Sequence, residues 1–154
     1  MKEKIRDKIN QAIGEKTFSA CAVGVVQTNG NRFVVPSGKF TFDASARVVQ
    51  ENTIFDVASI TKSIPTSSLA LKLIDKGRLR VEDKLINFVP EFNNSDRENV
   101  LIKHLLTQTL DYDFRLSAYK DKSADEILDV IFTTEFKSKP GTKFFVTNAT
   151  SILL

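Results

Sequence analysis

The sequence predicts an α+β fold with one β-hairpin near the N-terminus and mostly helices after it. Residues 18–27 (FSACAVGVVQ) and 33–35 are rich in small and β-branched residues, and Asn29-Gly30 between them is typical of a tight turn. A long helix is indicated from Ser59 to Gly77, and strand signals largely vanish beyond Gly77. We therefore expect one antiparallel strand pair followed by a helical region.

The N-terminal residues 1–14 (MKEKIRDKINQAIG) have the pattern of an amphipathic helix. Ile5, Ile9 and Ile13 recur every four residues with charged residues between them, and Gly14 is a natural helix stop. We expect this helix to lie on the surface of the protein.

The long helix is predicted to begin at Ser59 and to end with Gly77 as its C′ residue. Pro65 argues for an alternative start with Ser63 as N-cap, because proline lacks the N–H that would bond to the Thr61 carbonyl. The apolar positions that we expect to bury this helix are Leu69, Leu71, Leu73 and Ile74.

Beyond Gly77 we predict short helices joined by loops. Asp83 is expected to cap a short helix ending at Pro90, residues 93–96 form a loop, and residues 100–106 form a helix.

Further along the chain, Ser123-x-x-Glu126 is a capping box before the apolar residues 127–132, and Pro140-Gly141 marks a turn. We expect residues 78–154 to form a helical subdomain.

Ser59 and Lys62 are candidate catalytic residues because residues three apart on a helix share one face. A serine hydroxyl is a poor nucleophile until an adjacent base takes its proton, and a lysine amine can be that base. Unpaired backbone N–H groups at a helix N-terminus are also suited to binding an oxyanion. One helical turn could therefore supply a nucleophile, a base and part of an oxyanion hole.

Structural interpretations compete with this one. Ser59 alone could be an ordinary N-cap and Lys62 a solvated lysine, and the same spacing recurs at Ser117 and Lys120. His104 is the only histidine; a Ser-His-Asp triad using it is an alternative, although a packing role in its helix is favoured.

Composition excludes several classes of function. A single histidine and acidic residues without metal-ligand spacing predict no metal site, and no Gly-rich phosphate loop follows a strand, so we expect no cofactor. The net charge of +3 is dispersed, and with two Tyr and no Trp a nucleic-acid-binding surface is not expected.

The sequence has no apolar run long enough to cross a membrane and no secretory signal, so we expect no membrane partner and a cytoplasmic location. Cys21 stands alone, which excludes an internal disulfide, and its apolar surroundings predict a buried structural thiol.

Several motifs follow one another in order along the chain. They are residues 55–62 (FDVASITK), 69–85 (LALKLIDKGRLRVEDKL), 88–90 (FVP), 102–109 (IKHLLTQT) and 140–141 (PG), then Phe144, Asn148 and residues 152–154. Together they strongly resemble the serine beta-lactamase and penicillin-binding protein family. The closest similarity is to its class C-like branch, which includes D-aminopeptidases, D-alanyl-D-alanine carboxypeptidases and esterases. The resemblance spans nearly all of this chain but only the N-terminal part of the family's domain.

The resemblance implies a partial beta-lactamase-like fold and a hydrolase acting through an acyl-enzyme. Ser59 would be the nucleophile, Lys62 the base and Asn148 the contact to the substrate amide. The substrate would be a β-lactam, D-amino-acid peptide or ester with a reactive carbonyl. Residues 1–154 would form a single incomplete domain, with an α/β part (1–77) carrying the nucleophile helix and a helical subdomain (78–154).

Two departures from the family pattern predict impaired turnover. The family's Tyr-x-Asn motif corresponds here to Val146-Thr147-Asn148, and valine cannot transfer a proton. The third motif, a Lys-Thr-Gly-like triplet on an edge strand, would lie beyond Leu154, and with it the C-terminal strands of the sheet.

The hairpin would then have an unpaired edge, and the chain ends in an apolar run (SILL) as if cut. We therefore carry three hypotheses: a serine hydrolase, a non-catalytic penicillin-binding-protein-like homologue, and a half-domain that needs a complementing chain or forms a homo-oligomer.

Overall fold

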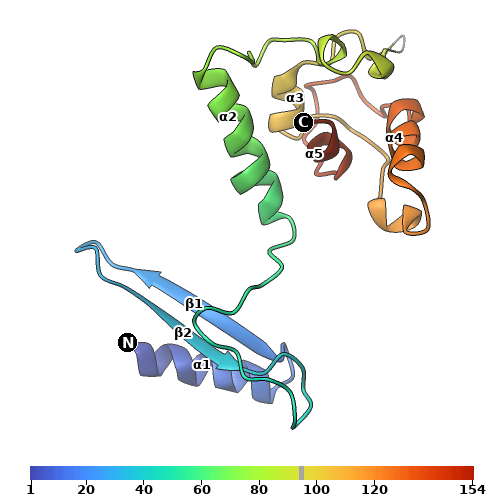
Figure 1. The fold of residues 1–154 in the computed structure, drawn as a ribbon. Coiled ribbons are helices and arrows are strands. Elements are labelled where there is room, and N and C mark those ends of the chain that lie inside the picture. The colour runs from blue at the N-terminus through green and yellow to red at the C-terminus, as the bar shows by residue number, and fades with distance from the viewer. Residues whose placement is uncertain (94–95) are drawn as a thin grey trace. The chain divides into compact units, whose positions relative to one another are not determined.

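The computed structural model describes residues 1–93 and 96–154, which form two compact units, Met1–Asp56 and Val57–Leu154 (Figure 1). Each unit is described by itself below. The division predicted from the sequence at residue 77 stays a prediction. Helices and a small sheet together give the expected α+β composition.

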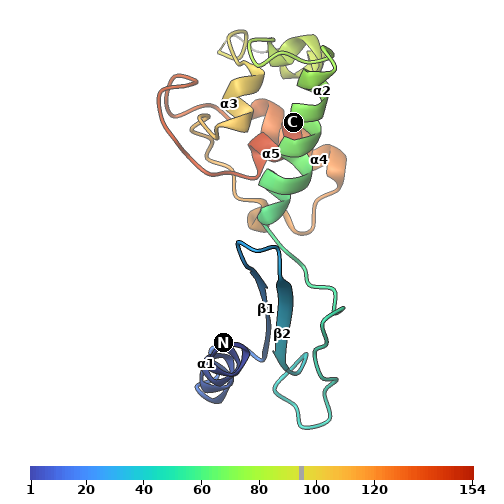
Figure 2. The same ribbon diagram turned by 90° about the vertical axis from the view of Figure 1, so that its left-hand side faces the viewer.

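The first unit contains helix α1 (Lys2–Gly14) and strands β1 (Ala20–Val26) and β2 (Arg32–Gly38), which pair antiparallel (Figure 2). The turn between the strands contains Gly30 at a φ of 85°, a conformation that glycine adopts without steric cost. The Asn29 side chain accepts a hydrogen bond from the Asn31 N–H at 3.0 Å. The predicted helix and hairpin are both confirmed.

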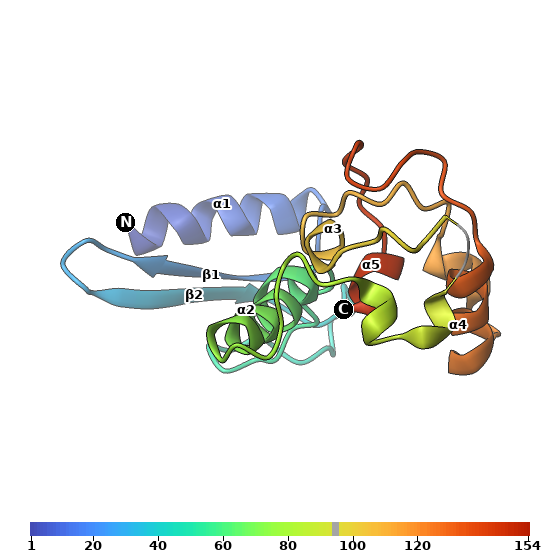
Figure 3. The same ribbon diagram turned by 90° about the horizontal axis from the view of Figure 1, so that it is seen from above.

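Helix α1 lies along the hairpin and covers one face of it (Figure 3). Ile9 on the helix and Val35 on β2 are buried, and the Ser37 hydroxyl donates to the Asn10 side chain at 2.6 Å. Cys21 on β1 is partly buried, so its thiol is less buried than the sequence predicted. The amphipathic pattern of residues 1–14 therefore positions the helix on the strands.

In the second unit, the predicted long helix divides into a wide π-type turn (Lys62–Ser67) and helix α2 (Ser68–Asp75). Pro65 lies inside the turn, where its missing N–H prevents a regular α-helical bond. In a π-type turn the N–H of residue 65 would bond to the Ile60 carbonyl, and here the Ser63 hydroxyl donates to that carbonyl at 3.1 Å as a replacement donor. The proline therefore widens the turn instead of moving the helix start to Ser63.

Helix α2 ends as predicted, with Gly77 at a φ of 66° and its N–H donating to the Ile74 carbonyl at 2.9 Å. The prediction that its leucines are buried is wrong. The exposed fractions are 62% for Leu69, 61% for Leu71 and 37% for Leu73, whereas Ala70 is buried. Apolar side chains project from several faces of this helix. Only the face that carries Ala70 and Ile74 packs on the core of this unit.

The rest of the second unit consists of short helices around one core. The predicted helix ending at Pro90 is replaced by two 3-10 turns, and the predicted helix 100–106 begins two residues later. The loop predicted at residues 93–96 lies partly outside the described residues. The elements are 3-10 turns at Leu85–Asn87, Pro90–Phe92 and Leu116–Tyr119, and helices α3 (Ile102–Leu106), α4 (Ala124–Thr133) and α5 (Ala149–Leu153).

Helix α4 begins with the predicted capping box. The Glu126 N–H donates to the Ser123 hydroxyl at 3.3 Å, and the Ser123 N–H donates to the Glu126 carboxylate at 2.9 Å. The Lys122 ammonium, 2.6 Å from this carboxylate, and the Ser123 N–H lower the pKa of Glu126 to about 2. The start of α4 is therefore fixed by local sequence alone.

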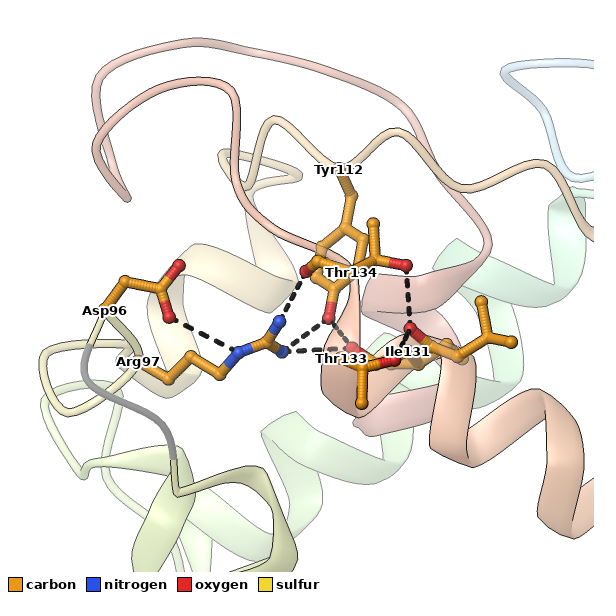
Figure 4. Close-up of polar contacts among 7 residues, drawn as sticks. Asp96, Arg97, Tyr112, Ile131, Thr133 and Thr134 are labelled. Carbon is orange, nitrogen blue, oxygen red and sulfur yellow. Dashed lines mark hydrogen bonds and ion pairs between the residues drawn. The ribbon is translucent and has the colours of Figure 1, made fainter.

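The core of this unit contains a fully buried arginine, Arg97 (Figure 4). Its guanidinium donates to the Tyr112 hydroxyl at 2.7 Å, to the Ile131 carbonyl at 3.0 Å and to the Thr134 carbonyl. Three aromatic rings also lie within cation-π distance of it. They are Phe92 at 4.6 Å, Phe136 at 5.0 Å and Tyr112 at 5.7 Å. This arginine ties the end of α4 to the loops that precede it.

Candidate active site

Ser59 lies exposed just before the helical turn, after a residue in an uncommon backbone conformation. Ala58 has a φ of 43°, in the left-handed region that residues other than glycine rarely adopt. Such a conformation persists only where its surroundings hold it, and it often occurs at functional sites. Here it turns the chain sharply immediately before the serine.

The backbone amides that follow Ser59 are already hydrogen-bonded. The N–H groups of Ile60, Thr61 and Lys62 donate at 3.0 to 3.1 Å to the carbonyls three residues earlier, which makes a tight first turn. These three amides are therefore not available to an oxyanion. Among the described residues, the N–H of Ser59 itself has no backbone acceptor, and it remains the candidate donor.

The Lys62 amine contacts both of the other predicted site residues. Its Nζ lies 3.0 Å from the Ser59 hydroxyl and 2.5 Å from Oδ1 of Asn148. Lys62 and Asn148 are partly buried, whereas Ser59 is exposed. The structure thus brings together the three residues that the sequence singled out.

Asn148 directly precedes α5, in a segment anchored by buried hydroxyls. Thr147 and Thr150, on either side of it, have exposed fractions of 4% and 0%. The backbone N–H of Thr147 and the hydroxyl of Thr150 both donate to the side-chain oxygen of Gln108, which follows α3. The sequence analysis did not single out Gln108, although it lies within the family-like segment IKHLLTQT.

A pocket of about 450 Å³ opens at these residues, with both polar and apolar walls. Its polar lining includes Ser59, Lys62 and Asn148, and Leu116 and Ile152 contribute apolar surface. A small polar group could therefore reach the serine hydroxyl from solvent while apolar atoms contact the walls.

Val146 does not line this pocket, and 57% of its surface is exposed. Its side chain has no donor or acceptor, so the position that the family motif gives to tyrosine supplies no proton here.

His104 has a structural role in α3, as the favoured interpretation predicted. Its Nδ1 accepts the Leu101 N–H at 3.2 Å, and a Cβ on Gly141 would lie 2.9 Å from its Nε2. Burial, and then the charge of Lys103, lowers the pKa of His104, so the ring is neutral at pH 7. It therefore packs against the turn at Gly141.

The second Ser-x-x-Lys copy forms no comparable pair. Ser117 and Lys120 are both exposed, and within the described part of the chain no hydrogen bond joins them. The spacing alone therefore does not create the Ser59 arrangement.

Neither a metal cluster nor a membrane helix is found in the described ranges. Residues 1–93 and 96–154 contain no group of three or more His, Cys, Asp or Glu side chains placed to hold an ion. Within the same ranges, no helix is both long and apolar enough to span a bilayer.

Comparison with known proteins decides the family. The family model described as Beta-lactamase matches residues 7–154. The chain belongs to the beta-lactamase family. Among curated relatives, Protein flp of Staphylococcus aureus is 31% identical over 110 residues, which cover 66% of this chain and 22% of that protein. The putative penicillin-binding protein PbpX of Bacillus subtilis is 26% identical over 136 residues, which cover 87% of this chain and 33% of PbpX.

Solved structures of the family share this fold. A class C beta-lactamase superposes with a TM-score of 0.84 at 22% identity, covering 99% of this chain and 41% of that protein. A beta-lactamase/D-alanine carboxypeptidase from Pseudomonas syringae gives a TM-score of 0.77 at 17% identity, covering 97% and 41%. The predicted partial beta-lactamase-like fold is confirmed, and the chain spans less than half the length of each of these relatives.

Proposed function

We propose that this chain carries the acylation centre of a serine hydrolase. Ser59 is the nucleophile, Lys62 is the base and Asn148 orients the substrate carbonyl group. The observation that carries the proposal is the position of the Lys62 amine, within 3.0 Å of the Ser59 hydroxyl and 2.5 Å of the Asn148 side chain. Hydrogen-bond reach between nucleophile and base, with a third group orienting the base, is the arrangement that activated nucleophiles need.

In the proposed reaction, the Ser59 oxygen forms a bond to the carbonyl carbon while its proton passes to the Lys62 nitrogen. The bond from that carbon to the leaving nitrogen or oxygen then breaks, and the proton moves to the leaving group. Water subsequently attacks the acyl-serine and releases a carboxylic acid. Among the described residues the Asn148 amide nitrogen has no acceptor, so it can donate to the substrate while the amide oxygen accepts from the lysine.

The substrate class we propose is a β-lactam, a D-amino-acid peptide or an ester. Support comes from the family assignment and from the names of similar proteins, which include class C beta-lactamases and a D-alanine carboxypeptidase. The pocket of about 450 Å³ fits a small substrate of this kind, with Leu116 and Ile152 available to apolar groups.

We also propose that turnover is impaired. Val146 cannot donate the proton that the family tyrosine handles, and general acid–base catalysis contributes about 10²–10⁴ in rate. The amides after Ser59 are committed to the helical turn, so a second oxyanion donor must come from elsewhere. One such donor contributes about 2.7–4 kcal/mol of transition-state stabilisation.

The test is intact mass spectrometry after incubation with a penicillin and, separately, with a fluorophosphonate. We expect a single adduct on the parent chain and none on Ser59→Ala, with Ser117→Ala as the matched control that keeps the adduct. An adduct that persists in Ser59→Ala, or a folded parent chain that neither reagent labels, contradicts the proposal.

Val146 favours a second candidate, a non-catalytic penicillin-binding-protein-like homologue that keeps the pocket for binding. The exposed Leu69 and Leu71 on α2 favour a further version, in which a complementing chain or a second copy covers these side chains. A chain that penicillin does not label but still binds supports the non-catalytic homologue. A native mass above that of the monomer supports the version in which another chain or a second copy covers α2.

A further inference from the structure

Gln108 is hydrogen-bonded to the chain on both sides of Asn148. Its side-chain Oε1 accepts the backbone N–H of Thr147 at 3.1 Å and the hydroxyl of Thr150 at 2.8 Å. Its backbone carbonyl accepts the N–H of Phe145 at 2.8 Å. One residue, 40 positions earlier in the sequence than Asn148, thus holds the segment from which the Asn148 side chain extends toward Lys62.

The backbone conformation of Gln108 is one that favours glycine. Its φ is 55°, and it is the first residue beyond the C-cap of α3, Thr107, where a left-handed residue commonly ends a helix. Any side chain there carries a conformational cost that glycine avoids. The presence of glutamine at this position therefore indicates that its side chain contributes something glycine cannot.

That contribution is a hydrogen-bond acceptor. The Thr147 N–H can only donate, so the atom facing it must be the Gln108 oxygen. The Thr150 hydroxyl has a second acceptor in the Thr147 carbonyl at 3.0 Å. The Thr147 N–H has no other acceptor among the described residues. Thr147 is buried, so loss of the glutamine oxygen would leave a buried donor unpaired and favour a shift of this segment.

We propose that Gln108 is a positioning residue of the Ser59 site. It sets Asn148 against Lys62, and through that lysine it affects the reactivity of Ser59. The effect on reactivity rests on the proposed hydrolase function, whereas the placement of Asn148 does not.

Four variants separate the possible roles of Gln108. Gln108→Met keeps the side-chain length and removes the acceptor, and Gln108→Glu keeps an acceptor oxygen. Gln108→Gly removes the side chain but suits the backbone conformation. Gln11→Met on α1 is the matched control, because Gln11 is exposed and its side chain bonds to the exposed side chains of Lys8 and Glu15.

Three measurements are made on each variant of the full chain. The first is the pair of Asn148 side-chain amide resonances in a ¹⁵N–¹H spectrum, assigned by their loss in Asn148→Asp. The second is the rate of Ser59 labelling by a fluorophosphonate, followed by intact mass. The third is the melting temperature, which reports a general loss of structure.

We expect the Asn148 resonances to shift or broaden in Gln108→Met and Gln108→Gly and to return to the parent positions in Gln108→Glu. Labelling should slow about tenfold or more in Gln108→Met and Gln108→Gly, because small misplacements of catalytic groups carry large rate penalties. Gln108→Gly should melt no lower than Gln108→Met while labelling as slowly. If Gln108 had a purely structural role, the labelling rate would follow the melting temperature in these variants.

Unchanged Asn148 resonances in Gln108→Met overturn the proposal, as does labelling at the parent rate in both Gln108→Met and Gln108→Gly. If the folded parent chain is not labelled at all, the hydrolase function fails. The Asn148 resonances then decide by themselves whether Gln108 positions this residue.

Discussion

The Nζ of Lys62 lies 2.5 Å from Oδ1 of Asn148, a contact between residues 86 positions apart. Lys62 begins the wide turn before α2, and Asn148 directly precedes α5. The same amine is 3.0 Å from the Ser59 hydroxyl. Both contacts lie inside the unit Val57–Leu154, so they do not depend on how the two units are arranged.

Removing the acceptor of this contact should weaken the proposed site. In Asn148→Leu the lysine loses one of the two side-chain partners that it has among the described residues, and its amine is no longer held against Ser59. We expect fluorophosphonate labelling of Ser59 to slow about tenfold, in line with the loss of one positioning hydrogen bond. Asn99→Leu, at an exposed position of the same unit, is the control. Equal labelling rates in the two variants would argue against a role for Asn148.

Restoring the family tyrosine should raise activity. Val146→Tyr adds a hydroxyl close in sequence to Asn148, where 57% of the valine is exposed, so the ring can be accommodated. We expect penicillin acylation to accelerate about tenfold or more, because a positioned proton donor contributes about 10²–10⁴ in rate. Val146→Phe supplies the ring without the hydroxyl. If both variants react equally fast, the missing phenol is not what limits this chain.

Gly141 should tolerate no side chain. Its φ is 82°, and an added Cβ would lie 2.9 Å from Nε2 of His104. We expect Gly141→Ala to lower the free energy of unfolding by about 2–4 kcal/mol through backbone strain plus the clash. Gly77→Ala, at a φ of 66° with open space around it, should lose only about 1–2 kcal/mol. Urea titration of both variants measures the difference, and equal losses would mean that His104 moves aside freely.

Arg97 should not be replaceable by lysine. Its guanidinium contacts the Tyr112 hydroxyl and the Ile131 and Thr134 carbonyls while lying near three aromatic rings, and an ammonium cannot reproduce this planar arrangement. We expect Arg97→Lys to lower the free energy of unfolding by about 3 kcal/mol. Arg6→Lys on the exposed face of α1 should change it little. Comparable losses in the two variants would contradict the core role of Arg97.

The capping box should make stability depend on pH. The folded-state pKa of Glu126 is lowered from 4.5 to about 2 by the Lys122 ammonium and the Ser123 amide. Its ionised form therefore stabilises the fold above pH 4.5, and this contribution disappears as the pH falls from 4.5 toward 2. Glu126→Gln should lower the urea midpoint at pH 7, and the gap from the parent should narrow at pH 3. A gap independent of pH would show that charge is not involved.

Local sequence determined much of this fold. Asn29-Gly30 specified a hairpin, Ser123-x-x-Glu126 specified the start of α4, and Gly77 specified the end of α2, because each acts through neighbours within a few residues. Ser59 and Lys62 were identified in the same way, by spacing along one turn. Asn148 was found only through the resemblance to the family.

Tertiary structure decided the rest. The apolar pattern of α2 could not reveal that Leu69 and Leu71 would remain exposed, because burial depends on where partner elements lie. Nor could it reveal that Gln108 would hold the chain around Asn148, because both the positive φ and the paired hydrogen bonds arise from packing between distant segments. The sequence by itself determined which residues were candidates for the proposed chemistry. Only the folded chain placed Lys62 between Ser59 and Asn148, because a contact across 86 residues depends on the packing that brings those segments together.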